Sequence, residues 1–570
     1  MRETLVKAIR SYWSKYGFPT GLGLFFALIG TLPYVYGYWL ADSEMRFMGF
    51  VGRGLFGRNG YLMLARQAQD GQFLLENLLT AETLPRVFMN LEWWLFGRTA
   101  TWTGLSLIGV FHLSRVAIVF LFMFSVWYLV RQCLATSFQQ KFATVLIACG
   151  SGCGWVAWCA SRAVYFAYPP GRAWLSQQDF GGEVFYNMLG PVPADISGVS
   201  VPSYLVCDPH FIVAAAFAAL MAGFLIRGAQ TGQRRYYALS GLAGSAHILI
   251  RPYNIPEMYL MLFLFSVLLC VQRRRFELKR FIDHLVPGLI MLPFVAYYAW
   301  LNHVDAMGPS RPAYYPCSFL SHIPWLGISF VACLLSAGRI RMFKAAQPAS
   351  LLLVLWFVIA YAIAQAHEFY SSGLEARFPA YMIVPPILAT AGPFRSWWHA
   401  IKRSNWMQRL GLANSHSLAV GVAIAVIALS APSGAIAYAR MFNTLQERPV
   451  PYYVSNDTYQ ALEWLEQNAG THDTVLSSFE TGQLIPRVAG VRAFQGHYML
   501  TINHARKSAL AKRFFEERND DAFKRQLAKE YGIRYVLAER PGEISATASH
   551  SWLKPRFAKG SAVVYEVVGE

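Results

Sequence analysis

Charged residues are scarce in this 570-residue sequence, and that scarcity decides its class. They make up 14% of the chain, whereas an average soluble domain carries about 25%. Hydrophobic residues account for 55%, and several runs of about 18 or more residues are almost free of charge, which is enough to span a bilayer core about 30 Å thick. The composition therefore excludes an ordinary soluble enzyme and predicts a polytopic membrane protein.

Several signatures of soluble catalysis and metal binding are also missing. The sequence has no Cys-x-x-Cys spacing, and most of its eight cysteines lie in apolar runs, where a free thiol behaves as a small hydrophobic group. The pattern GxSxG is absent from the chain, which argues against a serine nucleophile. The segment after about residue 440 has neither GxGxxG nor GxxxxGK[ST], which argues against a nucleotide-binding domain there. The basic N-terminus shows no cleavable signal peptide. Cys207 and Cys317 fall in predicted outer loops, so a disulfide between them stays open.

Hydropathy predicts eleven transmembrane spans with an N-terminus in the cytoplasm. They lie at 19–40, 105–130, 142–160, 209–227, 236–250, 253–271, 282–301, 318–337, 349–366, 378–392 and 417–437. Three of the inner connections carry the runs QRRRFELKR (272–280), RIRMFK (339–344) and RSWWHAIKRSNWMQR (395–409). The short outer connections hold one Arg each and no Lys, as the positive-inside rule requires. The net charge of +18 therefore favours anionic membrane lipid as a partner over nucleic acid.

This topology divides the chain into three parts. Residues 1–18 form a cytoplasmic N-terminus, and 19–437 form the transmembrane domain, with large outer loops at 41–104 and 161–208. From about 440 the composition becomes that of a soluble protein. A helix at 455–470, two helices within 505–532 and strands at 473–478, 533–539 and 561–568 predict a periplasmic α/β domain at 440–570.

The first outer loop is too long for a passive link and combines acids with aromatic rings. It contains Asp42, Glu44, Asp70, Glu76, Glu82, Glu92, Trp93, Trp94 and Trp102. Carboxylates that take hydroxyl protons and rings that cover sugar faces suit a saccharide site, although an interfacial aromatic belt explains Trp93 and Trp94 better. Tyr61 lies on the apolar face of a predicted surface helix. Arg66 and Asp70 are four residues apart, and the simpler interpretation is that they pair only with each other.

Several ionisable residues lie inside or at the ends of predicted spans. Arg115, near His112 in the second span, needs a partner or a wet cavity, because an arginine at that depth costs at least about 2.5–3.5 kcal/mol. Arg251 and Arg377, which follows Glu375, lie at outer span ends, where a guanidinium forks onto phosphate or extends to the headgroups. His210, close to Asp208, and Asp195 in the second outer loop are further polar candidates.

Short motifs along most of the chain resemble one known class. The first loop matches a pattern at Phe47, Gly49, Tyr61, Leu62, Arg66, Gly71, Asn77, Thr80 and Glu82. The segments FHLSRV (111–116), GSGCGW (150–155), PADIS (193–197), DPHF (208–211), RPYN (251–254) and EARFP (375–379) continue it. With a cytoplasmic start, many spans and an outer soluble domain, the chain resembles the GT-C class of membrane glycosyltransferases, and most closely a group of large bacterial membrane proteins of that class.

The resemblance implies a reaction and a site. GT-C enzymes take a sugar from a polyprenyl-phosphate donor at the outer leaflet, and the acceptor here would be a glycan, a lipid or a protein. A first-loop acid deprotonates the acceptor hydroxyl, which makes Asp42 the first candidate, followed by Glu44 and Asp70. The expected substrate-binding residues are Tyr61, Arg66, Arg115, Asp195, His210, Arg251, Glu375 and Arg377.

Three questions stay open at this stage. Gly57 stands where the family pattern has Asp, so a non-catalytic relative that binds lipid-linked glycan is one alternative. A transporter for a lipid-linked substrate is another, although internal repeats, which many transporters show, are absent. No cofactor is certain: a divalent metal such as Mg²⁺ or Mn²⁺ could help to neutralise the leaving phosphate, but no ligand set is evident. The expected location is the bacterial inner membrane.

Overall fold

The computed structural model describes residues 2–52, 55–156, 159, 201–272, 277–304, 319–335, 347–366, 373–409, 416–517 and 520–568. The chain forms two compact units. The first contains Met1–Thr31, Arg115–Ala296 and Tyr314–Arg440, and the second contains Leu32–Ser114, Tyr297–Ala313 and Met441–Glu570. Helices α1 (Arg2–Leu40), α4 (Leu107–Cys133) and α13 (Leu278–His303) contribute residues to both.

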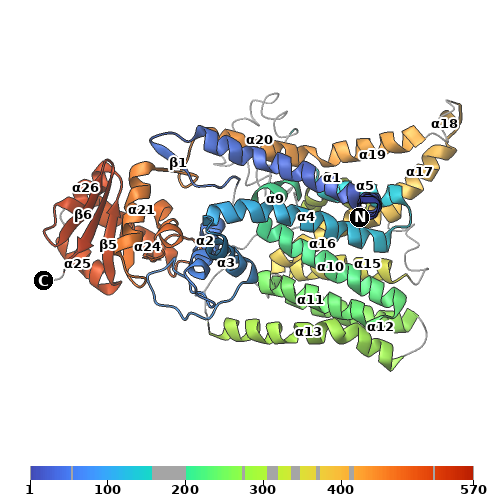
Figure 1. The fold of residues 1–570 in the computed structure, drawn as a ribbon, viewed down its shortest axis with the longest axis horizontal. Coiled ribbons are helices and arrows are strands. Elements are labelled where there is room, and N and C mark those ends of the chain that lie inside the picture. Colours follow the sequence, from blue (N-terminus) through green and yellow to red (C-terminus); the bar gives the residue numbers. More distant parts are fainter. Residues whose placement is uncertain are drawn as a thin grey trace. The chain divides into compact units, whose positions relative to one another are not determined.

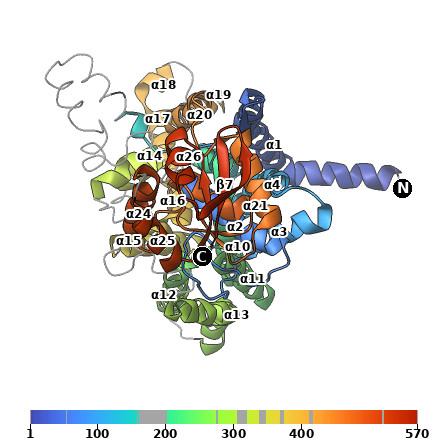
Figure 2. The same cartoon turned by 90° about the vertical axis from the view of Figure 1, so that its left-hand side faces the viewer.

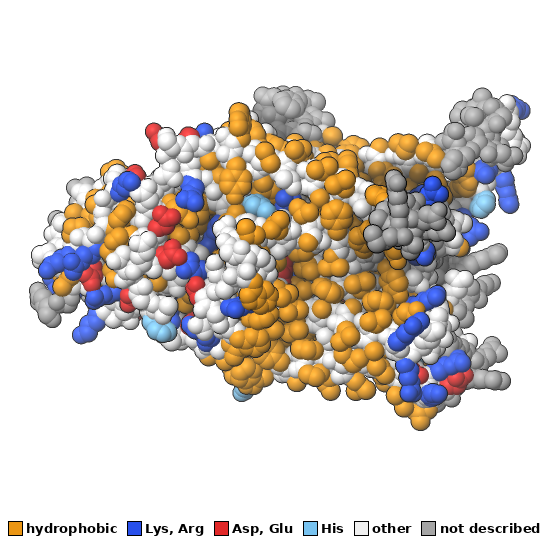
Figure 3. Space-filling view, in the orientation of Figure 1, with side chains coloured by type: hydrophobic (Ala, Val, Ile, Leu, Met, Phe, Trp, Pro, Cys, Tyr) orange, Lys and Arg blue, Asp and Glu red, His pale blue; other side chains and the backbone are white. Residues whose placement is uncertain are grey.

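Six helices within the described residues are long and apolar enough to cross a membrane. They are Arg10–Leu40 of α1, α4, α10 (Pro209–Thr231), Pro252–Gln272, which ends in α12 (Ile255–Gln272), α13 and α15 (Pro348–Gln365). A seventh span is possible in α19 (His416–Ser430) and α20 (Pro432–Gln446), which are bent by 47° at their junction. Leu113 on α4, Leu242 on α11 and Leu289 on α13 are exposed, and Figure 3 shows hydrophobic side chains over much of the surface of the helical part. The chain is therefore a multi-pass membrane protein.

The predicted count of eleven spans is not confirmed. Four predicted spans correspond to α5 (Ser137–Ala148), α11 (Arg234–Ile250), α14 (Phe319–Leu335) and α16 (Gly373–Ala391). The first two are short, at 12 and 17 residues. Helix α14 is interrupted at Gly327 by non-helical backbone, and α16 contains three prolines. Average hydropathy over a window does not register such breaks.

Helices α10 and α11 pack closely in the first unit because small residues line their contact. Ser240 on α11 donates a hydrogen bond to the Met221 carbonyl on α10 at 2.9 Å. A Cβ added at Gly244 would lie 2.3 Å from the Met291 sulfur and 3.1 Å from the Met221 sulfur. Small residues allow this close approach of helices in a membrane. The pair supports the turn at 251–254, which is a 3₁₀ helix, η2 (Pro252–Asn254).

The second unit is built around a five-stranded sheet in the order β4-β3-β5-β7-β6. Strands β5 and β6 are labelled in Figure 1 and β7 in Figure 2. Strand β3 (Thr474–Leu476) is parallel to β4 (Arg492–Ala493) and to β5 (Ile533–Ala538), whereas β7 (Ala562–Val567) is antiparallel to β5 and to β6 (Leu553–Lys559). Leu465, Leu484 and Val564 belong to one core cluster of this domain, and Phe514, Leu527 and Val536 belong to another.

Besides the ends of α1, α4 and α13, the second unit contains helices from the loop at 41–104 and from the C-terminal segment. The loop supplies α2 (Leu55–Gln69) and α3 (Leu91–Thr103), and the C-terminal segment supplies α21 (Asn456–Asn468), α22 (Phe479–Gly482), α23 (Ile485–Val488), α24 (His504–Glu516), α25 (Asp521–Glu530) and α26 (Pro541–Ala548). Helices α2 and α3 touch at Gly97, where an added Cβ would lie 2.2 Å from the Ala65 carbonyl oxygen.

The first outer loop and the C-terminal segment share a small sheet. Strand β1 (Met45–Phe47) pairs antiparallel with β2 (Tyr453–Ser455), and the backbone N–H of Met48 continues the pairing with a 2.7 Å hydrogen bond to the Tyr452 carbonyl. The loop is therefore anchored to the C-terminal segment by its backbone.

Candidate functional site

A cavity of about 440 Å³ lies in the second unit. Its walls come from the end of α1, from β1 and α2, from the start of α4, and from α21 and α23. Its charged and aromatic lining residues are Tyr38, Arg46, Phe47, Arg66, His112, Tyr459, Glu466 and Arg487. Three arginines and one carboxylate therefore face the same space.

Arg487 is the most deeply buried of the three arginines, with 6% of its surface exposed. Its guanidinium donates to Asn59 Oδ1 at 2.9 Å and to the Met48 carbonyl at 2.6 Å, and it lies 4.7 Å from the centre of the Phe50 ring. Burial lowers the pKa of Arg487 to about 10, so the group remains charged at neutral pH. Within the described part of the chain no carboxylate forms an ion pair with it.

The other two arginines differ in how their charge is balanced. The Arg46 guanidinium lies 3.8 Å from the centre of the Tyr459 ring, and no ion pair with Arg46 occurs among the described residues. Arg66 is paired with Asp70 at 3.1 Å and with Glu466 at 2.8 Å. Burial lowers the pKa of Arg66, but these two acids outweigh that effect and raise it. Within the described residues, the positive charges of Arg46 and Arg487 are therefore not balanced by an ion pair.

The three predicted catalytic acids all make structural contacts. Asp42 Oδ1 accepts the backbone N–H groups of Glu44 at 2.9 Å and Met45 at 2.8 Å, and Oδ2 pairs with Arg448. These backbone hydrogen bonds are the main reason that the pKa of Asp42 is lowered. Glu44 is exposed, and its carbonyl accepts the Asn456 backbone N–H at 2.8 Å. Asp70 pairs with Arg66, which lines the cavity. Their catalytic role remains a prediction.

The predicted binding residues are divided between the two units. Tyr61 stacks on Trp93 with ring centres 4.8 Å apart and so joins α2 to α3. Arg115 is 1% exposed and donates to Thr31 Oγ1 at 3.0 Å within the first unit. His210 is buried in α10. Arg251 is 3% exposed, with the Phe211 ring centre 4.0 Å from its guanidinium carbon.

Other predicted residues lie outside the described part of the chain. These are Asp195, Cys317 and the side chains of Glu375 and Arg377, although the backbone of the last two belongs to α16. Among the described residues no group of three or more His, Cys, Asp or Glu side chains is arranged to hold a metal ion. The sequence-based question of a divalent metal stays open.

Four residues with notable surroundings in the structure are not among the candidates from the sequence. Arg46, Tyr459 and Arg487 line the cavity, but none was singled out, because each lies in a different segment of the chain. Arg487 stands in the run GQLIPRVAGVRAFQGH (482–497), which carried only a family resemblance. In the first unit, Glu257 lies three positions after RPYN (251–254) in an apolar stretch, and an acid in such a stretch is a signal that the sequence offers.

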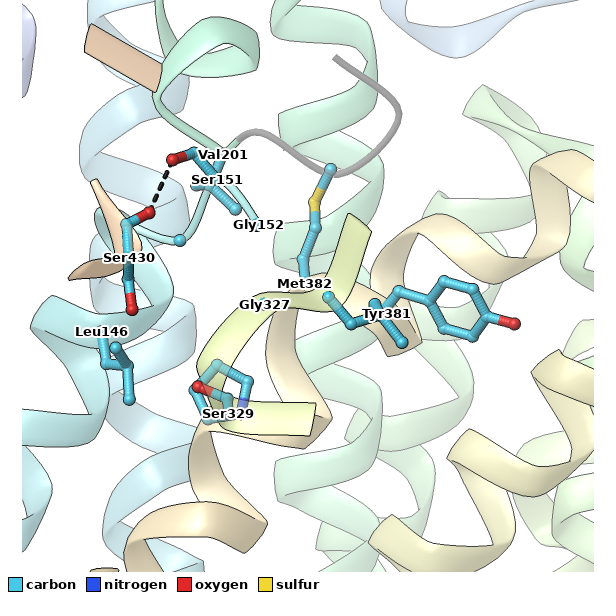
Figure 4. A pocket seen from close by; sticks show the side chains of 12 residues that line it. Leu146, Ser151, Gly152, Val201, Gly327, Ser329, Tyr381, Met382 and Ser430 are labelled. Atoms are coloured by element: carbon cyan, nitrogen blue, oxygen red, sulfur yellow. Dashed lines mark hydrogen bonds between the residues drawn. The ribbon is translucent and has the colours of Figure 1, made fainter. Parts of the chain in front are cut away.

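The glycine-rich motif GSGCGW (150–155) has a packing role in the first unit. Figure 4 shows Ser151 directed at Ser430, with a hydrogen bond of 2.6 Å from Oγ to the carbonyl oxygen. Gly327 has φ +65°, and a Cβ there would lie 3.0 Å from Gly152 Cα. The adjoining hollow measures about 20 Å³, enough for about one water molecule. The glycines therefore allow two backbones to approach, and the hollow is too small for a sugar.

Comparisons with known proteins identify the fold. No protein-family model and no curated protein sequence matches the chain. The oligosaccharyltransferase AglB from Archaeoglobus fulgidus, in complex with an inhibitory peptide and a dolichol-phosphate, has a similar structure with a TM-score of 0.51 and 12% identity, over 98% of this chain and 75% of that one. ArnT from Cupriavidus metallidurans in the apo state gives 0.50 and 12%, over 95% and 98%.

A third similar structure is the arabinofuranosyltransferase AftD from Mycobacteria, with a TM-score of 0.50 and 12% identity, over 96% of this chain and 40% of that one. All three are GT-C glycosyltransferases. The chain therefore has the GT-C fold, as its sequence motifs predicted. Identities this low establish the fold, and the reaction has to be argued from the residues.

Proposed function

We propose that the chain is a membrane glycosyltransferase that moves a sugar from a polyprenyl-phosphate donor to an acceptor on the outer face of a bacterial inner membrane. The observation that carries this proposal is the extent of the fold similarity. At least 95% of the chain, including its C-terminal segment, aligns with three separate transferases that act on sugars. A fold alone does not fix a function, so the chemistry of individual residues has to support it.

The first outer loop supplies the acids that the reaction needs. Glycosyl transfer passes through an oxocarbenium-like state while a carboxylate removes the proton of the acceptor hydroxyl. Asp42 is the first candidate base, with Glu44 and Asp70 behind it. The lowered pKa of Asp42 makes it a weaker base than a free carboxylate. Glu44 is exposed and is therefore a stronger candidate for the carboxylate that removes the proton.

Cations have to meet the charge of the leaving lipid phosphate. In this proposal Arg115, Arg251 and Arg377 supply them, and His210, Asp195, Glu375, Tyr61 and Arg66 bind the rest of the substrates. A guanidinium suits this role because it offers two parallel N–H donors to phosphate oxygens. A divalent metal that shares the role would show as a loss of turnover on chelation.

Turnover of the purified protein tests the proposal. Full-length protein in lipid nanodiscs is incubated with a panel of polyprenyl-phosphate sugars and envelope glycans, lipids or peptides, and released polyprenyl phosphate is measured. We expect transfer from at least one donor, and a loss of about 100-fold or more when the true base is replaced in Asp42→Asn, Glu44→Gln or Asp70→Asn. Glu516→Gln, an exposed acid on α24, is the matched control. Transfer rates of all three variants equal to that of the parent protein would exclude these acids as the base.

A second function is favoured by the contacts of the acids. Asp42 and Asp70 are both held in ion pairs, and Gly57 stands where the resembling family has Asp. A protein that binds lipid-linked glycan without transferring it would have no use for a free base. Saturable binding of a polyprenyl-phosphate sugar with no release of polyprenyl phosphate across the whole panel would support this function and refute the transferase.

A further inference from the structure

The cavity of the second unit has a charge imbalance that points to a ligand. Arg46 and Arg487 both face it, and Arg46 contributes to lowering the pKa of Arg487, so the two positive charges repel each other. The one acid in the lining, Glu466, is bound to Arg66. A buried cation without an acid is costly, and an anion between Arg46 and Arg487 would remove that cost.

The rest of the lining suits a sugar better than a bare ion. Phe47 and Tyr459 bring aromatic rings to the cavity, and Tyr38, Ser106 and His112 bring hydroxyl and imidazole groups. Aromatic faces cover the C–H faces of a sugar ring, while the polar groups bond its hydroxyls. At about 440 Å³ the cavity is within the range of small-molecule sites, far larger than one phosphate ion requires.

We propose that this cavity binds an anionic sugar, with its phosphate or carboxylate group between Arg46 and Arg487 and its ring against the aromatic wall. The guanidinium of Arg487 is held in place by Asn59 and by the Met48 carbonyl, so it is preorganised for the anion. Arg46 is exposed and can adjust to the ligand. The inference concerns binding only and does not require that a sugar is transferred.

Calorimetric titration of the full chain in nanodiscs tests this site with four probes: glucose 1-phosphate, glucuronate, glucose and inorganic phosphate. We expect the two anionic sugars to bind and glucose to bind at least about tenfold more weakly, because glucose forms no charge-assisted hydrogen bond with the two guanidinium groups. Inorganic phosphate is expected to bind more weakly than glucose 1-phosphate. If phosphate and glucose 1-phosphate bind with equal affinity, the cavity does not recognise the sugar ring. If glucose and glucose 1-phosphate bind with equal affinity, the cavity does not recognise the anion. Either result would refute the proposal.

Variants locate the binding within the cavity. Arg46→Gln changes an exposed side chain whose contact is a ring face, so the protein should fold, and its affinity for glucose 1-phosphate should fall about tenfold. Arg506→Gln, an exposed arginine of the same unit outside the cavity lining, should bind as the parent does. Tyr459→Leu should lower the affinity for the sugars and leave the affinity for inorganic phosphate unchanged. If Arg46→Gln and Arg506→Gln bind alike, the proposed site is wrong.

This experiment is independent of the proposed transferase. A chain that transfers sugar while Arg46→Gln leaves ligand binding intact would keep the proposed function and lose the anion site. A chain that binds glucose 1-phosphate through Arg46 but transfers no sugar would keep the anion site and lose the proposed function.

Discussion

Arg251 in the first unit and Arg487 in the second are both buried arginines, yet their surroundings differ. Arg251 is covered by aromatic rings, with Phe211 at 4.0 Å and Tyr253 at 5.5 Å from its guanidinium carbon. Arg487 touches one ring, at 4.7 Å, donates to a carbonyl and an amide, and faces a cavity. Ring faces stabilise a cation, and Arg487 in addition has open space beside it in the cavity. The fixed guanidinium of Arg487 is therefore the one of the two for which the structure shows a cavity that a ligand can enter.

The turn that carries Arg251 is held by a chain of buried polar groups. His247 Nδ1 lies 2.8 Å from the Ala214 carbonyl, which can only accept, so Nδ1 donates. His247 Nε2 is 3.1 Å from the Asn254 side-chain amide, and that amide contacts Glu257. Trp356 Nε1 donates to Glu257 Oε1 at 2.5 Å. Glu257 ends this chain and is the acceptor on which both Asn254 and Trp356 depend.

The largest predicted effect follows from removing that acceptor. Glu257→Ala leaves the buried donors of Asn254 and Trp356 without it, at a cost of about 1–3 kcal/mol for each donor. Glu257→Gln retains an oxygen for Trp356 and should cost clearly less. Thermal unfolding in nanodiscs, followed by intrinsic fluorescence, measures the difference. The control is Asp283→Asn, which removes an acid paired with the exposed Arg234. Equal losses for Glu257→Ala and Asp283→Asn would contradict the structural importance of this chain.

The next effect in size compares the two arginines directly. Arg487→Met removes hydrogen bonds to the Met48 carbonyl and to Asn59 and should lower stability by about 2–3 kcal/mol. Arg251→Met keeps the aromatic packing through an apolar side chain and should cost less. Arg487→Lys is expected to recover part of the loss, because an ammonium can replace only one of the two donors. The same thermal unfolding assay measures the loss of stability in each variant. A larger loss for Arg251→Met than for Arg487→Met would contradict the prediction.

The class of protein and the positions of many of its helices could be predicted from the sequence, whereas the cavity could not. Apolar runs place α4, α10, α13 and α15 close to their predicted bounds, because burial in lipid depends on composition that can be read locally. The amphipathic pattern at 455–470 likewise corresponds to α21. The predicted surface helix that carries Tyr61 is α2, and it ends at Gln69. The segment after it is fixed by long-range contacts such as the Asn77 side chain with the Leu500 carbonyl, at 2.8 Å.

The cavity could not be read from the sequence for the same reason. Arg46 and Arg487 are 441 positions apart in the chain numbering, and long-range contacts such as the hydrogen bond from Arg487 to the Met48 carbonyl bring their segments together. The acids of the first loop were visible as residue types, but their partners were not. Asp42 pairs with Arg448 and Asp70 with Arg66, and only the second pair is close enough in sequence to predict.

A smaller effect concerns the pH at which the second unit loses stability. His497 Nδ1 accepts the backbone N–H groups of Met499 at 3.0 Å and Leu500 at 3.1 Å, which requires that this nitrogen carry no proton. Burial lowers the pKa of His497 from 6.5 to about 4. The unfolded chain therefore binds a proton first, and stability should fall as the pH drops from about 6.5 to about 4.

Replacing the imidazole checks this assignment. The variant His497→Asn offers a side-chain oxygen to the same N–H groups and does not titrate, so its melting temperature should depend less on pH in that range. His472→Asn changes an exposed histidine and should keep the slope of the parent protein. Parallel slopes for all three proteins would show that His497 is not the group that titrates.

The smallest expected effect on stability separates structure from catalysis at Asp70. Its side chain is 48% exposed and pairs with Arg66, which keeps Glu466 at 2.8 Å and the Val488 carbonyl at 2.9 Å as further partners. Asp70→Asn should therefore change the unfolding free energy by less than about 0.5 kcal/mol. A transfer rate that falls far more than this change predicts would make Asp70 part of the reaction, because lost stability of that size leaves nearly all molecules folded. An unchanged rate would restrict Asp70 to its ion pair and leave Asp42 and Glu44 as the candidate bases.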